Sequence, residues 1–388
     1  LRELEVLFDD QPQPYGYDLL TGGSLRQFKL DRRINLMMED DFGGVFEATL
    51  SNLALRSPLV EHISVLNSDS PFIDYGKFSN LRTLEHIGTF TVASWMEICA
   101  RCTLLEDFSI SWIKDDLVGE DTITATGPQI QELPVLRVLS ISSMYEPDGV
   151  VSSHILRTTN MPQLRELKMD LYKLGSVEAD GLMSLLSRRC PLLTMLQVIS
   201  PRLEWGRLAL FSGLRDLELQ GELSSWTTEH LESIIGGLPN LRQLSIRGLY
   251  GGVDRSKPAF TPTILEAIAK TCQLRRLQIP LNALEIPWMQ EPPAPTAKFA
   301  GLMHLSLGPL HIEADAVEPF AKYLAQLCPT INSFEPIPIH PQEAGSEHWN
   351  SNRFPFFLTD EEETRKKMMQ TLYFNAQRVV LEESCYVR

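Results

Sequence analysis

The sequence predicts an α/β fold in which strand–loop–helix units stack one after another as a solenoid. Three observations lead to this prediction: a short apolar pattern recurs thirteen times, helix start and stop signals stand between its copies, and the chain is long. Its 388 residues, 43% of them hydrophobic, exceed the roughly 250–300 residues at which an ordinary single core stops growing. A fold that extends in one direction accommodates this length without separate globular domains.

The repeated pattern is apolar-x-x-apolar-x-apolar, and most copies open with Leu-Arg. We number its residues as positions 1 to 6, so the apolar residues stand at positions 1, 4 and 6. The copies begin at residues 1, 25, 60, 81, 105, 136, 164, 193, 214, 241, 274, 302 and 331. The twelve steps average 27.5 residues and range from 21 to 35, which agrees with the roughly 20–29 residues of leucine-rich repeats. The sequence therefore predicts a leucine-rich repeat solenoid (horseshoe) of about 13 strand–loop–helix units over residues 1–335, with a parallel sheet on the concave face.

Helix signals stand in the intervals between several strands. Thr227 is a good N-cap, and a glycine pair follows as a stop signal. Thr261 is expected to cap another helix with Pro262 at its first position, where a missing N–H costs nothing, and Pro319 is expected to repeat this device. In each unit the apolar strand positions face the helix, so neighbouring units must stack to bury them. The expected helices cover residues 177–190, 227–239, 261–272 and 318–328.

Cysteine recurs at one phase of the repeat, two or three residues before a strand. In "RRCPLLTMLQVIS" (188–200), Cys190 could be a nucleophile, a metal ligand, half of a disulfide or a small buried side chain. Other copies carry Leu or Met at this phase, so we favour burial, because free cysteine behaves as a small hydrophobe. Cys99 and Cys102 form the one Cys-x-x-Cys pair, and the remaining cysteines fall on separate units, so we expect no metal site. The cysteines at this phase are Cys102, Cys190, Cys272 and Cys328.

Two segments, "RRCPLLTMLQVIS" and "AQLCPTINSFEPI", end a helix in Cys-Pro before the next strand, and "ARCTLLEDFSI" matches in part. In this feature the chain resembles the leucine-rich repeat region of F-box proteins, of the cysteine-containing, fungal-like type, over roughly residues 1–335. The resemblance implies a protein–protein interaction module that recognises the substrate of an F-box-type ubiquitin ligase adaptor. It implies a Skp-type adaptor as a further partner, bound through an F-box upstream of Leu1 that this sequence does not contain.

Two other functions stay open at this point. The chain could be a free-standing leucine-rich repeat scaffold in signalling or assembly, with no role in ubiquitin transfer. An extracellular repeat receptor is disfavoured, because the sequence has no Asn-x-Ser/Thr sequon and no cysteine-rich caps. The segment ahead of Leu1 would distinguish the hypothesis of a ubiquitin ligase adaptor from that of a free-standing scaffold.

Composition disfavours several classes of function. The net charge of −15 and the pI of 5.1 disfavour a nucleic acid or an anionic membrane as partner. No run of 18 apolar residues predicts a membrane span, and "LRELEVLFDD" is unlike a signal peptide. Six cysteines are too few for a disulfide scaffold. We therefore expect an intracellular protein, cytoplasmic or nuclear.

Catalytic signatures are missing from the sequence. It contains no G-x-S-x-G, Gly-Lys-Ser/Thr loop, H-E-x-x-H or G-x-G-x-x-G motif, and its eight histidines are scattered. His62 and His304 fall on strand positions where either could contact a partner. We expect neither enzymatic activity nor a cofactor.

The expected partner surface is the strand face opposite the helices. The arginine at position 2 recurs in eight of thirteen copies, and it could form a ladder for acidic motifs or be a solvated residue whose stem packs along its neighbours; we favour the second interpretation. Position 5 gives a mixed polar face, with neither a basic stripe nor an aromatic row, which suits a protein partner. The position-5 residues are Glu5, Lys29, Ser64, Glu85, Ser109, Ser140, Lys168, Gln197, Glu218, Ser245, Gln278, Ser306 and Glu335.

Long loops are expected to add specificity. They cover residues 113–132, 247–260 and 281–301, and the second is the one locally basic, aromatic segment of an acidic chain. Trp288 in the third could anchor a partner or pin the loop to the solenoid. We expect the contact region in repeats 10–12. The candidate binding residues are Arg247, Tyr250, Arg255, Lys257, Arg276, Gln278, Trp288 and His304.

The last part of the chain departs from the repeat. Residues 336–388 predict an irregular C-terminal cap with a helix that begins near Thr359. Its acidic start and the basic residues at 365–367 complement a helix dipole. A polar, atypical end unit is what a solenoid requires.

Overall fold

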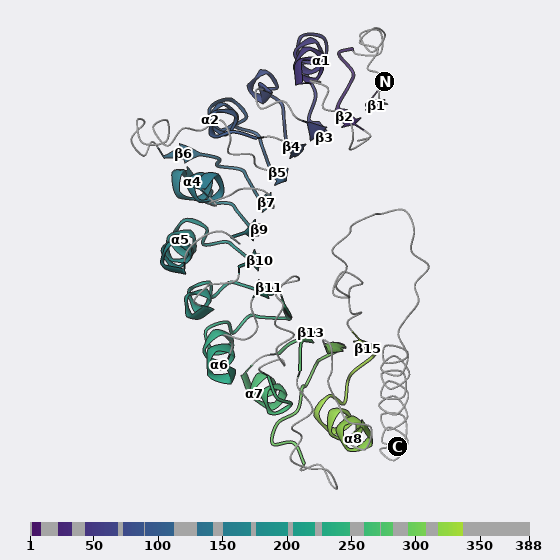
Figure 1. Cartoon of the computed structure of the whole chain (residues 1–388), viewed down its shortest axis with the longest axis vertical. Coiled ribbons are helices and arrows are strands. Elements are labelled where there is room, and N and C mark those ends of the chain that lie inside the picture. Colours follow the sequence, from purple (N-terminus) through teal and green to yellow (C-terminus); the bar gives the residue numbers. More distant parts are fainter. Residues whose placement is uncertain are drawn as a thin grey trace, which may run out of the picture. The chain divides into compact units, whose positions relative to one another are not determined.

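A computed structural model gives the fold of the chain, which divides into two compact units, unit 1 (residues 1–204) and unit 2 (residues 205–388). In each unit, parallel strands run side by side, and the helices lie along one face of the sheet (Figure 1). The structure describes residues 2–8, 22–32, 43–68, 73–88, 90–111, 130–142, 150–171, 176–200, 205–221, 227–248, 260–271, 273–281, 294–307 and 317–336.

The strands of the main sheet follow the chain order, and every one falls on a copy of the repeat. All thirteen strands expected from the sequence are therefore confirmed. In unit 1 they are β1 (Glu3–Phe8), β2 (Gln27–Arg32), β3 (His62–Ser68), β4 (Thr83–Gly88), β5 (Asp107–Ser111), β7 (Val138–Ser142), β9 (Glu166–Asp170) and β10 (Met195–Ile199). In unit 2 they are β11 (Asp216–Gly221), β12 (Gln243–Gly248), β13 (Arg276–Ile279), β14 (His304–Leu307) and β15 (Ser333–Pro336).

The helices stand between the strands and cover the apolar face of each sheet (Figure 1). Unit 1 has α1 (Gly43–Arg56), the 3₁₀ helix η2 (Tyr75–Lys77), α2 (Val92–Arg101), α4 (Val150–Thr158) and α5 (Ser176–Arg189). Unit 2 has the 3₁₀ helix η3 (Trp205–Leu210), α6 (Thr228–Gly236), α7 (Thr263–Thr271) and α8 (Val317–Leu327).

Side chains alternate between the two faces of the sheet, as the repeat pattern requires. In β5, Phe108 and Ile110 at positions 4 and 6 are fully buried, while Asp107 and Ser109 at positions 3 and 5 are half-buried on the other side. We call that second side, formed by positions 3, 5 and 7, the open face. The helices thus leave the polar positions of the strands available for contact.

A backbone pattern at position 2 joins successive strands in register. Within each unit, the carbonyl oxygen of a position-2 residue accepts hydrogen bonds from the amides at positions 2 and 3 of the next strand. For example, the carbonyl of Arg242 accepts from Arg275 at 2.7 Å and from Arg276 at 3.1 Å. Because the same geometry recurs along both units, equal positions of neighbouring repeats are held one strand spacing apart.

The strand–loop–helix units differ in the kind of helix that they contain, and this depends on the number of residues between successive strands. The two shortest steps, from residue 60 to 81 and from 193 to 214, have 21 residues each, and both contain a short 3₁₀ helix in place of an α-helix. A second small sheet pairs β6 (Gln131–Glu132) with β8 (Thr159–Asn160), and the sequence did not predict it.

The helix starts agree with the sequence in part. Thr227 caps α6 and accepts a hydrogen bond from the amide of His230, so this prediction is confirmed. Pro262 lies just before α7, which begins at Thr263, and Pro319 is the third residue of α8, so the expected first-turn positions are wrong by one to two residues. Both prolines still avoid an unmet donor, because the first four amides of a helix have no partner within it. The expected C-terminal helix near Thr359 lies outside the described residues.

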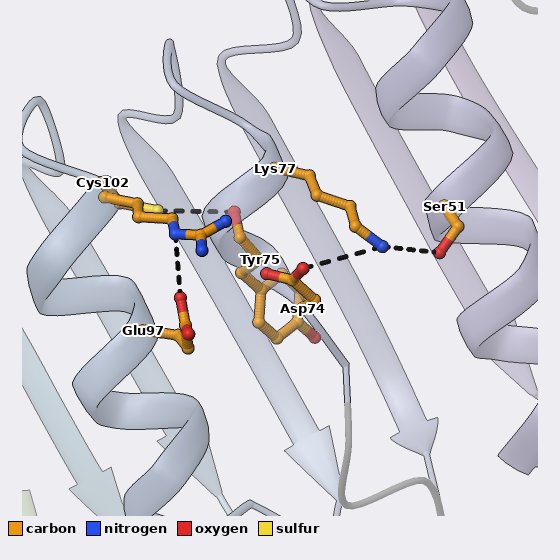
Figure 2. A network of polar contacts seen from close by, with 7 residues as sticks. Ser51, Asp74, Tyr75, Lys77, Glu97 and Cys102 are labelled. Atoms are coloured by element: carbon orange, nitrogen blue, oxygen red, sulfur yellow. Dashed lines mark hydrogen bonds and ion pairs between the residues drawn. The ribbon is translucent and has the colours of Figure 1, made fainter.

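The cysteines at the helix ends are buried, as expected. Cys102, Cys190 and Cys328 are at most 1% exposed, and Cys272 lies outside the described residues. The Cys102 thiol donates to the carbonyl of Tyr75 at 3.4 Å, which joins the end of α2 to η2 (Figure 2). On the other side of η2, the Lys77 ammonium donates to the Ser51 hydroxyl of α1 at 3.2 Å. These contacts stabilise the short 3₁₀ turn between its two neighbouring helices.

Candidate functional site

The open face places the position-5 residues in register within each unit. In unit 1 they run from Glu5 to Gln197, and in unit 2 from Glu218 to Glu335, as Cα partners on adjacent strands. The sequence-based assignment of this row is therefore confirmed by the strand register. Serine, glutamine and charged residues alternate along it, so it offers hydrogen-bond donors and acceptors of both kinds.

A polar cluster lies on the open face of unit 2 across β11, β12 and β13. The Gln278 side-chain oxygen accepts from the Ser245 hydroxyl at 2.9 Å and from the Arg247 guanidinium at 3.2 Å. The same guanidinium lies 3.4 Å from a carboxylate oxygen of Glu218. We call Glu218, Ser245, Arg247 and Gln278 the Gln278 cluster. Its members orient one another and remain partly exposed.

Four of the eight candidate binding residues lie within the described part of the chain. Arg247 and Gln278 contact each other directly. Arg276 and His304 are Cα partners on β13 and β14, and both are exposed on the open face. The structure thus brings these four residues to one region of unit 2. The other candidates lie outside the described residues and stay predictions: Tyr250, Arg255, Lys257 and Trp288.

Glu218 and Ser245 belong to the cluster but were not among the candidate residues. Sequence reasoning had placed both at position 5, and the strand register makes them neighbours of Gln278 or Arg247. An alignment of positions 5 and 7 across successive repeats would have found them. Arg247 stands at position 7 and contacts residues on both neighbouring strands. This signal is present in the sequence once the repeats are aligned.

The position-2 residues form a second row, and their charges are arranged differently in the two units. In unit 1, Arg26 pairs with Glu61 at 3.4 Å, and Glu106 pairs with both Arg82 and Arg137. In unit 2, arginine follows arginine on three adjacent strands. All three are exposed and have no ion pair or side-chain hydrogen bond among the described residues: Arg215, Arg242 and Arg275.

Thiol chemistry is disfavoured at the described cysteines. Burial raises the pKa of the Cys99, Cys102 and Cys190 thiols to about 12, and burial also raises the pKa of Cys328. A nucleophilic cysteine needs a lowered pKa instead. Across the described ranges no three His, Cys, Asp or Glu side chains gather as metal ligands would. The helices in those ranges include none long and apolar enough to cross a bilayer.

The stacked strands, the buried apolar positions and the polar open face define a leucine-rich repeat solenoid, and solved structures with this fold resemble the chain. An internalin from Listeria monocytogenes is 12% identical with a TM-score of 0.33, and the match covers 80% of this chain and 61% of the internalin chain. LegL7, a leucine-rich repeat-containing protein from Legionella pneumophila, is 10% identical with a TM-score of 0.39. The match covers 86% of this chain and 90% of the LegL7 chain. A chain of the yeast Rad7–Elc1 complex is 13% identical with a TM-score of 0.39. The match covers 79% of this chain and 84% of that chain. These likenesses concern the fold alone.

Comparison of the sequence with protein-family models and with curated proteins gives no match.

Proposed function

We propose that the chain is a protein–protein interaction module whose contact surface is the open face of unit 2. The observation that supports this is the Gln278 cluster, in which three adjacent strands hold charged and uncharged polar groups in fixed relative positions. Polar groups that are oriented before binding lose less conformational entropy when a partner binds. The mixed row of donors and acceptors suits the polar surface of a protein.

The proposed surface extends beyond the cluster. Arg276 and His304 continue it on β13 and β14. Tyr250, Arg255 and Lys257 follow β12 in the sequence, and Trp288 follows β13, so we include them as proposed contact residues. Aromatic and arginine side chains commonly carry the largest part of the binding energy at protein interfaces.

A matched pair of double variants tests this proposal. Ser245→Glu with Ser306→Lys changes the position-5 row of unit 2, while Ser109→Glu with Ser140→Lys makes the same change in unit 1. All four serines are half-buried on the open face, and neither double variant alters the net charge. Quantitative affinity purification from cells should lose the bound partners with the unit 2 variant and retain them with the unit 1 variant. Retention of every partner by both variants would contradict the proposed surface.

As the kind of interaction, we propose substrate recognition for an F-box-type ubiquitin ligase adaptor. The Cys-Pro elements at Cys190 and Cys328, both buried at helix ends, support this. The alternative is a free-standing scaffold, and eleven of the thirteen repeats favour it because they lack Cys-Pro. Purification of the protein with all residues that precede Leu1 in the cell separates the two. Co-purification of a Skp-type adaptor would support the proposed role in a ubiquitin ligase. Binding of other partners without this adaptor would support the scaffold function.

A further inference from the structure

The row of arginines at position 2 in unit 2 has a chemistry that the proposed function does not yet use. Arg215, Arg242 and Arg275 stand on β11, β12 and β13 or directly before them, and their backbones are hydrogen-bonded in succession at 2.7 Å. Arg276 adds a fourth exposed arginine at position 3. Met303 continues the row on the next strand and ends its basic part. We call these four arginines the arginine row.

Equal charges on adjacent strands repel each other, so this arrangement destabilises the free protein. In unit 1, Glu61 and Glu106 stand between arginines at the same repeat position, so equal charges are adjacent there only as the pairs Arg2–Arg26 and Arg137–Arg165, and Arg26 and Arg137 are each paired with a glutamate. Within the described residues of unit 2, Arg215, Arg242, Arg275 and Arg276 have no acidic partner. Glu218, the carboxylate at position 5 of β11, is already paired with Arg247. Among the described residues, the arginine row is therefore a set of cationic donors without an acidic partner, on the surface of an acidic chain.

From this geometry we propose that the arginine row binds a short run of Asp and Glu residues in the partner protein. The inference rests on the proposed binding function and specifies the chemistry of the partner. Arginine binds carboxylates through two parallel hydrogen bonds, so one carboxylate can serve each guanidinium.

The spacing of the row fits an extended acidic peptide. Neighbouring strands lie about 4.8 Å apart, so three successive arginines span roughly 10 Å. An extended peptide rises about 3.3 Å per residue, so about four consecutive acidic residues span the same length. Arg215, Arg242 and Arg275 are distributed one per strand along the row. This distribution favours several single carboxylates over one phosphate group, which binds best where guanidinium groups converge.

A nucleic acid is a less suitable occupant than a short peptide. Nucleic-acid binding draws on many phosphate contacts along an extended basic surface. The arginine row is local, and the chain as a whole carries a net charge of −15. A longer polyanion would extend into regions that repel it, whereas a run of a few acidic residues matches the length of the row.

Fluorescence anisotropy with the whole chain tests the inference. The probe is a labelled peptide with four consecutive Asp and Glu residues between Gly-Ser flanks. A peptide with Asn and Gln in their place is the neutral control, and a peptide with a single phosphoserine tests the alternative anion. We expect the acidic peptide to bind at least tenfold more tightly than the other two, and binding to weaken as salt rises, since exposed charges are screened beyond about 8 Å at physiological salt.

Two triple variants with the same loss of charge locate the binding. The unit 2 triple variant combines Arg215→Gln, Arg242→Gln and Arg275→Gln, and it should bind the acidic peptide at least tenfold more weakly. The unit 1 triple variant combines Arg26→Gln, Arg82→Gln and Arg137→Gln, and its affinity for the peptide should change less than twofold. Replacing Arg215, Arg242 and Arg275 by Lys keeps the charge but removes the paired donors, so it should give an intermediate affinity. Circular dichroism should show unchanged folding, because these three side chains have no partner to lose within the described residues.

Several outcomes would overturn the inference. Equal losses from the two Gln triples would show non-specific charge attraction, and tighter binding of the phosphoserine peptide or equal binding of the neutral peptide would reject the acidic run. The proposed function is tested separately by the serine variants. If they remove the cellular partners while the Gln triple in unit 2 retains them, the binding surface stands and the acidic partner is rejected.

Discussion

The two units place charge at the same repeat position in different ways. Along position 2 of unit 1, glutamates interrupt the arginines, and three of the arginines are ion-paired. In unit 2 three arginines follow one another, and a mixed polar cluster lies beside them on the open face. The recurrence of arginine in the repeat therefore has no single explanation. Its role depends on which residue stands at the same position one repeat away.

Each unit also has a polar contact that its strand pattern alone does not explain. Position 6 is apolar in every repeat except one, where His86 of unit 1 is buried with its Nδ1 2.7 Å from the Tyr75 hydroxyl. In unit 2 the corresponding polar contact lies in the helix layer, where Glu266 of α7 accepts from Tyr323 of α8 at 3.0 Å. The His86 contact thus lies within the core of unit 1, and the Glu266 contact joins two helices of unit 2. The predictions that follow use these differences.

The largest expected effect is on the core of unit 1. Trp95 of α2 is fully buried, its ring stacks on Phe108 at a centroid distance of 5.3 Å, and its indole N–H donates to the Thr159 hydroxyl at 3.0 Å. Trp95→Ala should lower the free energy of unfolding by about 3–5 kcal/mol. Hydrogen exchange of the β5 and β7 amides measures this within unit 1. Leu55→Ala, at a side chain 82% exposed, is the control; a loss below 1 kcal/mol for Trp95→Ala would show that this core tolerates a cavity.

A glycine in unit 2 gives the next effect. A Cβ atom at Gly237, after α6, would lie 2.3 Å from the Cβ and 2.8 Å from the Cα of Ala209 in η3. Gly237→Ala should therefore force these segments apart and lower the free energy of unfolding by about 1–3 kcal/mol. The neighbouring Gly236 has open space around its Cβ position, so Gly236→Ala should be neutral or stabilising by up to about 1 kcal/mol. Urea unfolding compares the two variants, and equal effects would refute the close approach to η3.

A pH dependence distinguishes the helix layer of unit 2. Burial alone would raise the pKa of Glu266, but hydrogen bonds from the Thr296 hydroxyl and amide and from the Tyr323 hydroxyl, together with Lys270, hold this pKa below the usual value of a glutamate. Because the pKa is lowered in the folded state, the stabilisation is present above the unfolded pKa and disappears as the pH falls through the folded pKa. Glu266→Gln should therefore lower the free energy of unfolding by about 1 kcal/mol at pH 7, and by progressively less below about pH 4.3.

Unfolding measured from pH 7 to pH 3 tests the Glu266 prediction. Tyr323→Phe removes one of the donors and should give a smaller effect of the same sign. Glu232→Gln on the exposed side of α6 is the control, and it should change the free energy of unfolding by less than about 0.5 kcal/mol. A cost for Glu266→Gln that stays constant over this pH range would show that the carboxylate charge is not what these hydrogen bonds stabilise.

Much of the fold could be predicted from the sequence because its signal is local. The apolar pattern of each strand occupies six residues, and thirteen copies reinforce one another. The 3₁₀ helices at the two 21-residue steps were missed, although the step lengths contain that signal. The pairing of β6 with β8 had no comparable signal, because each strand has two residues and depends on contacts from elsewhere in the chain.

The candidate surface was predictable in part for a related reason. Gln278 and Arg247 were chosen as separate residues, and their contact follows from the register of β12 and β13, which the sequence fixes only after the repeats are aligned. The arginines at position 2 were interpreted as solvated residues. The exposed arginines of unit 2, which have no ion pair among the described residues, agree with that interpretation, whereas Arg26, Arg82 and Arg137 of unit 1 are paired with a glutamate of a neighbouring repeat.

The smallest expected effect tests the comparison of the two rows most directly. Glu106→Gln removes the common partner of Arg82 and Arg137, whose side chains are 47% and 62% exposed. Since exposed ion pairs contribute about 0.2–1 kcal/mol, the free energy of unfolding should fall by about that amount at low salt and change little at 1 M salt.

Arg242→Glu makes the opposite change by placing a carboxylate between Arg215 and Arg275, as in unit 1. It should raise the free energy of unfolding by about 0.2–1 kcal/mol at low salt while weakening the acidic peptide. Arg242→Gln removes the same charge without adding a partner, so it should stabilise less. If Arg242→Glu does not stabilise the protein, the arginines of unit 2 do not repel one another measurably. The destabilisation of the free protein would then no longer support a bound acidic partner.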